Sequence, residues 1–399
     1  MVPPVLDIIL HKGREKSLRR RHPWLLSGAV ARVKGSGEPG DWTRVLSDSG
    51  EVLGFGHYSP TSSLRVRMLS FGKEHADERD RVAAAIDRAI AYRTGAGAAA
   101  VLLGETDAMR LINSEGDGLP GLIVDRYADT LVFKFTTAGM ARLRETIFEQ
   151  VSTLAGAAHG IERPDATAAR RESFVARDGT AFGEPPALVA IHERDREYEV
   201  DLKTGQKTGF YLDQRDARDL VQKLSSGRRV LDLFSYTGGF SVAAIRGGAA
   251  SVTAVDSSSG ALAFVERNAI ANEGEVEVVR ADAFEWMRRC SDKFDLLVVD
   301  PPPLARSRRD VPKATRAYKD VTMHALRSAA PDALLAVFAC SHHIGPDLFR
   351  KVVFGAATDA GQTLQVLAEL GAPADHVVSL DHPEGQYLNG LLLRVEGAR

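Results

Sequence analysis

The stretch from Arg228 to Phe240 constrains the fold of this chain more than any other. It reads RRVLDLFSYTGGF, an apolar run that ends in a turn with two adjacent glycines. Such a run predicts a buried strand of a parallel sheet, and the glycines predict a tight loop where backbone approaches a ligand. The loop lacks the Gly-x-Gly-x-x-Gly spacing that seats a dinucleotide pyrophosphate, so a nicotinamide cofactor is disfavoured.

Asp232 lies within this stretch, near the carboxyl end of the predicted strand. A carboxylate there suits a cationic or amine-bearing ligand better than a phosphate. S-adenosylmethionine carries an ammonium and a sulfonium, and we therefore expect it as the cofactor. For this stretch alone, a strand and glycine turn of an ordinary doubly wound sheet is the alternative.

Length and composition set wider bounds. The chain has 399 residues, of which 44% are apolar, so it can bury two or three cores. It contains neither an apolar run of about 18 residues nor a signal-peptide core, and we expect a cytoplasmic protein. Its only cysteines are Cys290 and Cys340, which excludes a disulfide framework and a cysteine-rich zinc site. No metal is expected.

One basic segment lies near the N-terminus. The formal net charge of −2 argues against wholesale nucleic-acid binding, but six of the ten residues from 12 to 21 are basic. Phosphates attract such a cluster, and a neighbouring tryptophan can stack on an unpaired base. The candidate RNA-binding residues are Lys12, Arg14, Lys16, Arg19, Arg20, Arg21 and Trp24. A solvated basic segment is the alternative.

The pattern of strands and helices predicts several domains. Short apolar runs at 42–46, 52–58 and 64–69, separated by turn residues, predict a small β-barrel. An amphipathic helix over 75–93, an antiparallel meander over 109–135 and a helix over about 141–154 predict an α+β unit. A hairpin follows over 187–202. We expect domains at 1–74 and 75–186, a hairpin and linker at 187–215, and a last domain at 216–399.

From Arg228 onward, strands alternate with helices. This alternation predicts a doubly wound α/β domain with a seven-stranded sheet. The expected strands are 230–234, 251–256, 276–280, 294–300, 334–340, 376–380 and 387–395.

Carboxylates follow three successive strands of this domain. Asp232, Asp256 and Asp282 are expected along the crevice at the carboxyl ends of the strands. Asp256 is placed to bind ribose hydroxyls, and Asp282 to receive an adenine amino group. Each alone could be a surface residue or a helix cap.

Two further strand ends carry the expected chemistry. Asp300 begins an Asp-Pro-Pro-Pro run, where a rigidly held carboxylate suits a planar base. Cys340 ends the next strand and is therefore expected beside Asp300. A thiolate that adds to carbon 6 of cytosine would make carbon 5 nucleophilic, with Asp300 near ring N3. Cys290 and the pair His342 and His343 are interpreted as structural or pocket-shaping residues.

A polar, glycine-bearing segment over 203–215 precedes the first strand of this sheet. Such segments are usually connections, but its position predicts a wall of the ligand site. The residues expected in that wall are Lys207, Thr208, Gly209, Asp213 and Arg215.

Several motifs together resemble the bacterial ribosomal RNA large-subunit methyltransferase I family. They are KTGFYLDQR at 207–215, LDLFSYTGGF at 231–240, Asp-Pro-Pro at 300–302, Tyr-Lys-Asp at 318–320 and Ala-Cys-Ser at 339–341. The residues at 13–24 are similar to the N-terminal PUA domain of that family, and those at 113–125 to its central domain. The likeness covers the whole chain.

The resemblance implies an S-adenosylmethionine-dependent enzyme that makes 5-methylcytosine in ribosomal RNA. It implies a PUA-like barrel, a small α+β domain and a Rossmann-like class I methyltransferase domain, with a homodimer left open. Cys340 would be the nucleophile and Asp300 the acid that grips the base. Besides the wall residues, the cofactor set would be Asp232, Phe234, Ser235, Tyr236, Thr237, Gly238, Gly239, Asp256, Ser257, Asp282, Ala283, Asp300 and Pro301. The chain departs from the family at Pro303, where lysine is usual, and at His342, where a small residue is usual.

Two other functions stay open. One is methyl transfer to a base nitrogen with Cys340 structural, although Pro303 stands where such enzymes usually place an aromatic residue. The other is a non-catalytic RNA-binding or ribosome-assembly protein.

Overall fold

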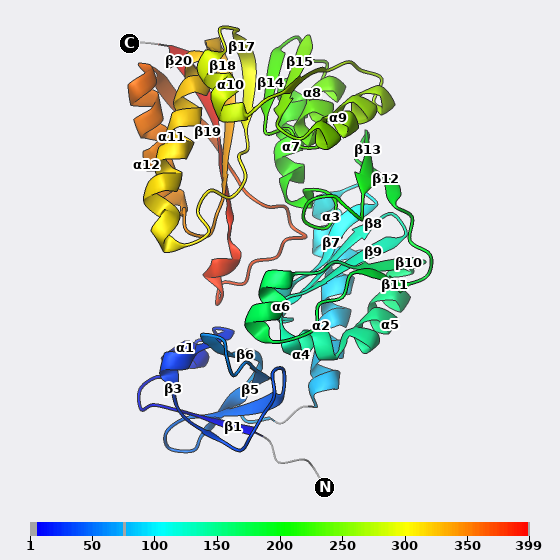
Figure 1. Ribbon diagram of the computed structural model, residues 1–399, viewed down its shortest axis with the longest axis vertical. Helices are drawn as coiled ribbons and strands as arrows, with labels where there is room; N and C mark the ends of the chain where they lie inside the picture. The colour runs from blue at the N-terminus through cyan, green and yellow to red at the C-terminus, as the bar shows by residue number, and fades with distance from the viewer. Residues whose placement is uncertain (1–5, 75–76, 398–399) are drawn as a thin grey trace. The chain divides into compact units, whose positions relative to one another are not determined.

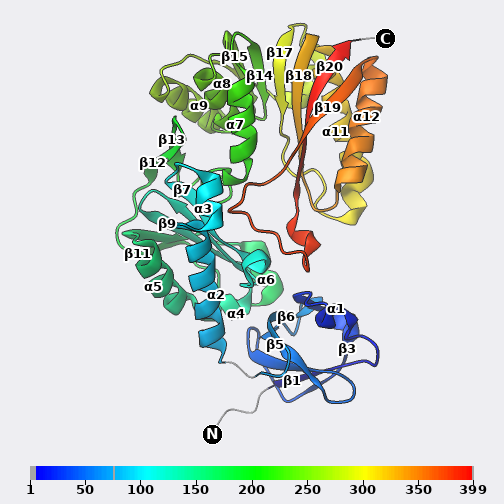
Figure 2. The same cartoon turned by 180° about the vertical axis from the view of Figure 1, so that it is seen from behind.

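The computed structural model describes residues 6–74 and 77–397, which fall into two compact units (Figures 1 and 2). The first unit comprises residues 1–189, 201–209 and 374–385, and the second comprises 190–200, 210–373 and 386–399. His75, where the first amphipathic helix was expected to begin, lies outside the described residues. Among the described residues, no helix combines the length and apolar character that crossing a bilayer requires.

The first unit begins with a six-stranded sheet of order β2-β6-β5-β4-β1-β3. Its buried core gathers apolar side chains such as Ile8, Val45 and Val66, as the predicted barrel requires. Strand β4 alternates half-buried and buried side chains, because successive residues of a strand point to opposite faces. The elements are β1 Leu6–Leu10, α1 Lys16–Arg19, β2 Trp24–Leu26, η1 Ser27–Ala29, β3 Val30–Lys34, β4 Trp42–Leu46, β5 Val52–Tyr58 and β6 Leu64–Phe71.

A second sheet of the same unit has the order β11-β10-β9-β8-β7. Strands β7, β8 and β9 form the predicted antiparallel meander, and β10 adds in parallel to β9. Helix α2 begins at the N-cap Asp77 and buries Val82, Ile86 and Ile90, which share one helical face. The elements are α2 Glu78–Arg93, α3 Ala98–Leu103, β7 Ala108–Asn113, η2 Ser114–Asp117, β8 Leu122–Tyr127, β9 Thr130–Phe135, α4 Ala138–Arg142, α5 Arg144–Ala155, β10 His159–Glu162, α6 Ala166–Glu172 and β11 Gly179–Phe182.

A two-stranded hairpin, β12 Leu188–Glu193 and β13 Arg196–Asp201, precedes the large sheet. The sheet of the second unit has seven strands in the order β16-β15-β14-β17-β18-β20-β19. All neighbours from β16 to β18 are parallel, and β20 is antiparallel to both β18 and β19. Strand β14, Arg229–Leu233, lies at the centre, as its apolar run predicts.

Helices cover both faces of this sheet, which gives three layers (Figure 1). One core holds side chains from α10, α11 and α12, and the other holds side chains from α7 and α8. The elements are η3 Leu212–Gln214, α7 Arg215–Leu224, α8 Gly239–Arg246, β15 Ser251–Asp256, α9 Ser259–Ala271, β16 Glu277–Arg280, α10 Ala283–Arg289, β17 Phe294–Val299, η4 Arg308–Asp310, α11 Val311–Arg327, β18 Ala329–Cys340, α12 Pro346–Ala360, β19 Thr363–Leu370, η5 Pro383–Gly385 and β20 Leu388–Gly397. The predicted doubly wound α/β domain is confirmed.

One strand was predicted in the wrong place. The strand expected at residues 376–380 is absent there. Its place in the sheet is taken by β19, Thr363–Leu370, which lies at the edge. As the edge of the sheet, β19 exposes apolar Val366 and Leu367 and lacks the buried run that marks a central strand. Its pattern is therefore weak in the sequence.

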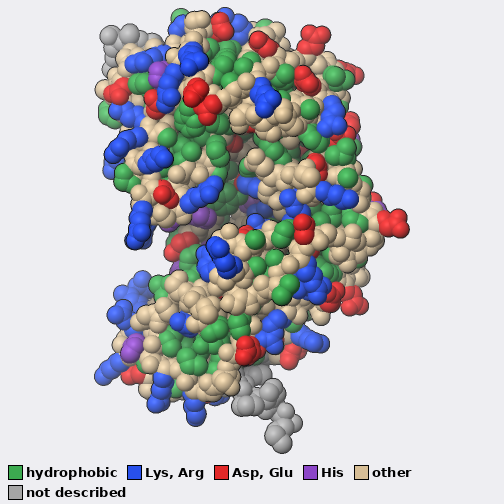
Figure 3. Space-filling view, in the orientation of Figure 1, with side chains coloured by type: hydrophobic (Ala, Val, Ile, Leu, Met, Phe, Trp, Pro, Cys, Tyr) green, Lys and Arg blue, Asp and Glu red, His purple; other side chains and the backbone are tan. Residues whose placement is uncertain are grey.

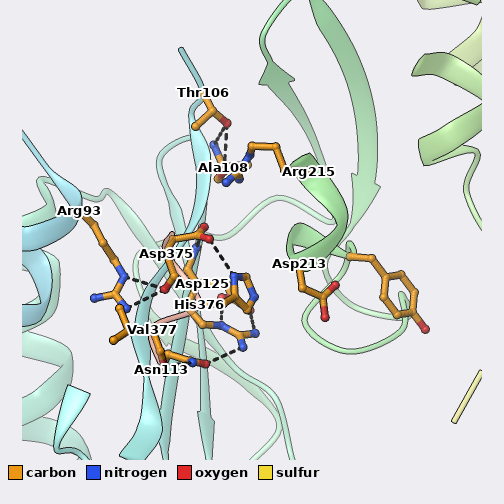
Figure 4. Close-up of polar contacts among 12 residues, drawn as sticks. Arg93, Thr106, Ala108, Asn113, Asp125, Asp213, Arg215, Asp375, His376 and Val377 are labelled. Carbon is orange, nitrogen blue, oxygen red and sulfur yellow. Dashed lines mark hydrogen bonds and ion pairs between the residues drawn. The ribbon is translucent and has the colours of Figure 1, made fainter. Parts of the chain in front are cut away.

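Side chains of the first unit hold residues 374–385 instead (Figure 4). Arg93 donates to the Asp375 carbonyl at 3.0 and 2.7 Å, and Asn113 donates to the Val377 carbonyl at 2.9 Å. The Asp375 carboxylate accepts from the Arg110 amide at 3.0 Å. The backbone carbonyls of Asp375 and Val377 thus accept hydrogen bonds from side chains and not from a neighbouring strand.

Candidate active site

The loop between β14 and α8 has an unusual backbone. Phe234 and Tyr236 have φ values of 62° and 49°, and Gly238 has 84°. Left-handed conformations of non-glycine residues are costly and gather at functional sites. The loop is secured by hydrogen bonds from the Phe234 and Ser235 amides to the Val255 carbonyl, and from the Asn268 side chain to the Thr237 carbonyl.

The two glycines of this loop lie close to neighbouring side chains of the protein. A Cβ on Gly238 would approach Val265 at 3.1 Å, and one on Gly239 would approach Arg218 at 3.3 Å. The positive φ of Gly238 is a further reason for glycine at that position, because side chains rarely adopt it. The Ser235 hydroxyl is buried and has no hydrogen-bond partner among the described residues, which marks a polar group that a ligand could satisfy.

Asp232 is bonded to the helix that follows the loop. Its carboxylate accepts from the Ser241 amide at 3.0 Å and from the Ser241 hydroxyl at 2.7 Å. Burial, with smaller contributions from Asp300 and Asp256, raises the pKa of Asp232 to about 7. These contacts show Asp232 fastening α8 to β14, and its contact with a cofactor stays a prediction.

Asp256 and Asp282 lie at the carboxyl ends of the neighbouring strands β15 and β16. Asp256 accepts from the Tyr236 amide at 3.0 Å and from the Ser258 amide at 2.8 Å. Asp282 caps α10 through the Glu285 amide at 2.9 Å. Each bond fixes the orientation of a carboxylate that keeps further lone pairs. Such acceptors fit the ribose hydroxyls and the amino groups of S-adenosylmethionine.

Asp300 and Cys340 lie together, as predicted. They follow or end the adjacent parallel strands β17 and β18, and Cys340 Sγ donates to Asp300 Oδ1 at 3.5 Å. The Gln214 amide donates to the other carboxylate oxygen, Oδ2, at 2.8 Å. Both Asp300 and Cys340 are half-buried. A thiol and a carboxylate in this arrangement can exchange a proton.

Aromatic residues surround this pair. Burial raises the pKa values of Tyr211 and Tyr318, and Asp300 and Cys340 raise both further. Their phenols are therefore neutral hydrogen-bonding groups. Tyr387, directly before β20, lies with its ring 5.7 Å from that of His342. The pattern of the sequence did not single out Gln214 or Tyr387, although Gln214 stands inside the predicted wall segment.

The predicted wall at 203–215 is divided between the two units. Lys207, Thr208 and Gly209 belong to the first, where the Thr208 hydroxyl donates to Asp125 at 2.6 Å and lies 2.8 Å from the Tyr127 hydroxyl. Asp213 and Arg215 belong to the second. Asp213 accepts from the Tyr387 hydroxyl at 2.6 Å.

Arg215 is fully buried, with its Nε 3.3 Å from Glu193 of β12. Thr208 and Arg215 thus have structural partners, and their contact with a cofactor stays a prediction. The remaining predicted cofactor residues, Ser257, Ala283 and Pro301, directly follow Asp256, Asp282 and Asp300.

The six basic residues between 12 and 21 are all exposed, and blue side chains gather around α1 in Figure 3. Arg19 pairs with Glu51 at 2.5 Å. Trp24 is half-buried, because its indole N–H donates to Glu115 at 2.8 Å and its ring lies 4.6 Å from that of His382. The six cations are thus exposed to solvent, with Arg19 in an ion pair, whereas Trp24 is held by contacts with other residues. Among the described residues, no cluster of His, Cys, Asp and Glu could hold a metal ion.

Comparisons with known proteins fit this geometry. Residues 130–382 match the model of the S-adenosylmethionine-dependent methyltransferases, and residues 8–71 match that of the PUA-like domain. Ribosomal RNA large subunit methyltransferase I of Enterobacter sp. is 38% identical over 395 residues, which cover 97% of this chain and 99% of that protein. The same-named protein of Aeromonas hydrophila is 40% identical over 396 residues, with the same shares.

The chain belongs to the ribosomal RNA large subunit methyltransferase I family. A solved structure of a proposed S-adenosylmethionine-dependent methyltransferase from Streptococcus mutans shares its fold, with a TM-score of 0.81 and 23% identity over 98% of this chain and 100% of that one. Another proposed methyltransferase, solved in complex with SAH, has a TM-score of 0.82 and 23% identity over the same shares. S-adenosylmethionine is therefore the cofactor of this family member, and its N-terminal domain is PUA-like.

Proposed function

We propose that this family member methylates carbon 5 of a cytosine in large-subunit ribosomal RNA. Relatives with near-complete coverage are named for large-subunit ribosomal RNA methylation, which supports the substrate class. The observation that carries the choice of atom is the 3.5 Å contact between Cys340 Sγ and Asp300 Oδ1 at adjacent strand ends. A base nitrogen needs no thiol, whereas carbon 5 becomes nucleophilic only after a nucleophile adds to carbon 6.

Asp300 has two roles in this reaction. It first takes the proton of Cys340, and the resulting thiolate forms a bond to carbon 6 of the cytosine. Asp300 then gives the proton to ring N3 as the ring accepts the electron pair. S-adenosylmethionine supplies the electrophilic methyl group. A base then takes the carbon-5 proton, the carbon–sulfur bond breaks with its electron pair returning to Cys340, and N3 returns its proton to Asp300, which restores the aromatic ring.

The experiment compares the two cysteines. Cys340→Ser should abolish one 5-methylcytosine in mapped ribosomal RNA, whereas Cys290→Ser should keep it. RNA with 5-fluorocytosine should trap a covalent adduct with the wild type and with Cys290→Ser only. Full modification by Cys340→Ser at normal protein levels would refute the covalent mechanism. If Cys340→Ala stays active while Asp300→Ala does not, the target is a base nitrogen.

We also propose that the basic segment from Lys12 to Arg21 binds the RNA backbone. All six cations are exposed. The chain as a whole has a formal net charge of −2, so attraction to RNA phosphates has to come from local basic segments such as this one. Replacing Lys16 and Arg20 by alanine should weaken RNA binding and lower the slope of log affinity against log salt by about 0.7 per lost contact. Arg88→Ala removes an exposed charge from α2 and serves as the control. An unchanged slope in the double variant would count against this surface.

A further inference from the structure

Three neighbouring strands bring their ends to the proposed catalytic pair. Strands β17, β18 and β20 are adjacent in the sheet, in that order. Asp300 follows β17, Cys340 ends β18, and Tyr387 directly precedes β20, where Cys340 pairs with Leu388. The thiol therefore stands on the middle strand, with Asp300 and Tyr387 on either side.

The short helix η3 is bonded to both outer strands. Gln214 Nε2 donates to Asp300 Oδ2 at 2.8 Å, and the Tyr387 hydroxyl donates to Asp213 Oδ2 at 2.6 Å. Asp213 and Gln214 are consecutive residues, and each is only 2% exposed. Two adjacent buried side chains thus span the strand that carries Cys340.

The bond from Gln214 decides how Asp300 faces the thiol. An ionised carboxylate only accepts hydrogen bonds, so the amide nitrogen of Gln214 must face it. With Oδ2 held in this way, Oδ1 is left toward Cys340 Sγ, 3.5 Å away. Without the amide, one restraint on rotation of the carboxylate is lost, and Oδ1 is held less firmly toward the thiol.

We infer that Gln214 is a positioning residue that orients Asp300 toward the thiol of Cys340, while Asp213 anchors Tyr387 on the opposite side. This inference rests on the proposed function. The S–H bond breaks and its proton passes to Asp300 Oδ1, while the sulfur electron pair forms the bond to carbon 6. The same proton then goes to ring N3. Gln214 touches none of the reacting atoms and acts through Asp300.

Other titratable groups also face Asp300. They are Cys340 of β18, Tyr211 before η3, Tyr318 of α11 and Asp232 of β14. These four neighbours are acids or phenols. The Gln214 amide differs from them as a neutral donor, and its hydrogen bond favours an ionised carboxylate. Loss of that donor should therefore weaken the proton acceptor that faces the thiol.

The test uses Gln214→Met and Gln214→Glu in the full chain that carries Cys290→Ser. Methionine has a similar length but no donor, and we expect adduct formation with 5-fluorocytosine RNA to slow by up to about 100-fold, as misplacement of a catalytic group can cost. The acidic limb of its pH–rate profile should move to higher pH, because a hydrogen bond to the carboxylate favours its charged form. Glutamate donates only when protonated, so Gln214→Glu should regain activity as the pH falls. Gln222→Met on α7 is the matched control, because Gln222 bonds Asp195 and Arg196 instead.

Affinity for S-adenosylmethionine, measured by calorimetry, should stay within about twofold in all variants, since the inferred role lies outside cofactor binding. An adduct rate and an acidic limb unchanged in Gln214→Met would overturn the inference, and so would a parallel loss of cofactor affinity. The proposed function fails differently: the wild type would form no adduct. In that case the acidic limb of methyl transfer still tests whether Gln214 orients Asp300.

Discussion

At the scale of single residues, the second unit holds carboxylates in opposite electrostatic situations. Asp232 is buried and accepts hydrogen bonds from Ser241, and its pKa is raised to about 7. Glu193 is equally buried, but three arginines lower its pKa to about 2. The number of cationic partners decides the direction, because desolvation raises the pKa of both.

Asp232→Asn should change how stability depends on pH. The folded pKa of about 7 lies above the ordinary value, so the folded state binds the proton more tightly than the unfolded state. The contribution of this carboxyl is complete below its ordinary pKa and is lost as the pH rises to about 7. Asparagine cannot ionise, and its oxygen can still accept from Ser241.

From pH 5 to pH 8 the wild type should therefore lose about 3 kcal/mol relative to Asp232→Asn in urea unfolding. Asp332→Asn, a change at an exposed carboxylate, controls for the altered net charge. Parallel pH curves for the wild type and Asp232→Asn would contradict the prediction.

At the scale of elements, one buried ion-pair network fastens the hairpin to α7. Glu193 of β12 accepts from Arg218 and pairs with Arg215, both of α7, and with Arg196 of β13. All four side chains are almost fully buried. The network explains why Arg215, a candidate for the ligand wall, is engaged by the protein itself.

Glu193→Gln should destabilise the second unit by about 3–5 kcal/mol, because it removes the buried carboxylate that pairs with Arg218 and Arg215. Asp195→Asn is the control, since Asp195 pairs with Arg246 near the surface and should cost less than about 1 kcal/mol. The stability that Glu193 contributes is present above its ordinary pKa and is lost as the pH falls toward about 2. Equal losses for both variants in denaturant unfolding would refute this account.

At the scale of the whole molecule, neither compact unit is a continuous piece of chain. The path passes between them after residues 189, 200, 209, 373 and 385. The first unit therefore includes residues far along the sequence, and Arg93 is one of the residues that bind such a segment. It donates to the Asp375 carbonyl and to the Asp117 carboxylate, and its side chain is fully buried.

Arg93→Met should destabilise the first unit by about 3–5 kcal/mol and release residues 374–385, because Asp117 stays buried without its cation. Limited proteolysis mapped by mass spectrometry should find new cleavage within 374–385. Arg44→Met, which breaks a half-exposed pair with Asp7, should leave this segment protected. Protection equal to that of the wild type in Arg93→Met would contradict the predicted dependence.

Most of the methyltransferase fold can be predicted from the pattern of apolar and polar residues. Central strands such as β14 and β17 are buried on both faces and appear as apolar runs in the sequence. Because parallel strands end at one edge of a sheet, the sequence also predicts that Asp300 and Cys340 lie together, as they do. Local periodicity likewise located α2 and the meander of the first unit.

Other features, which depend on contacts between residues distant in the sequence, could not be predicted from the sequence and are seen in the folded structure. Edge strand β19 has no buried run, and residues 376–380 owe their path to Arg93 and Asn113. The partners of Thr208 and Arg215, and the bond from Gln214 to Asp300, join residues from 22 to 86 positions apart. The local pattern of residues shows which side chains are buried. Which hydrogen bonds and ion pairs form depends on the residues that the folded chain brings into contact, and these are distant in the sequence.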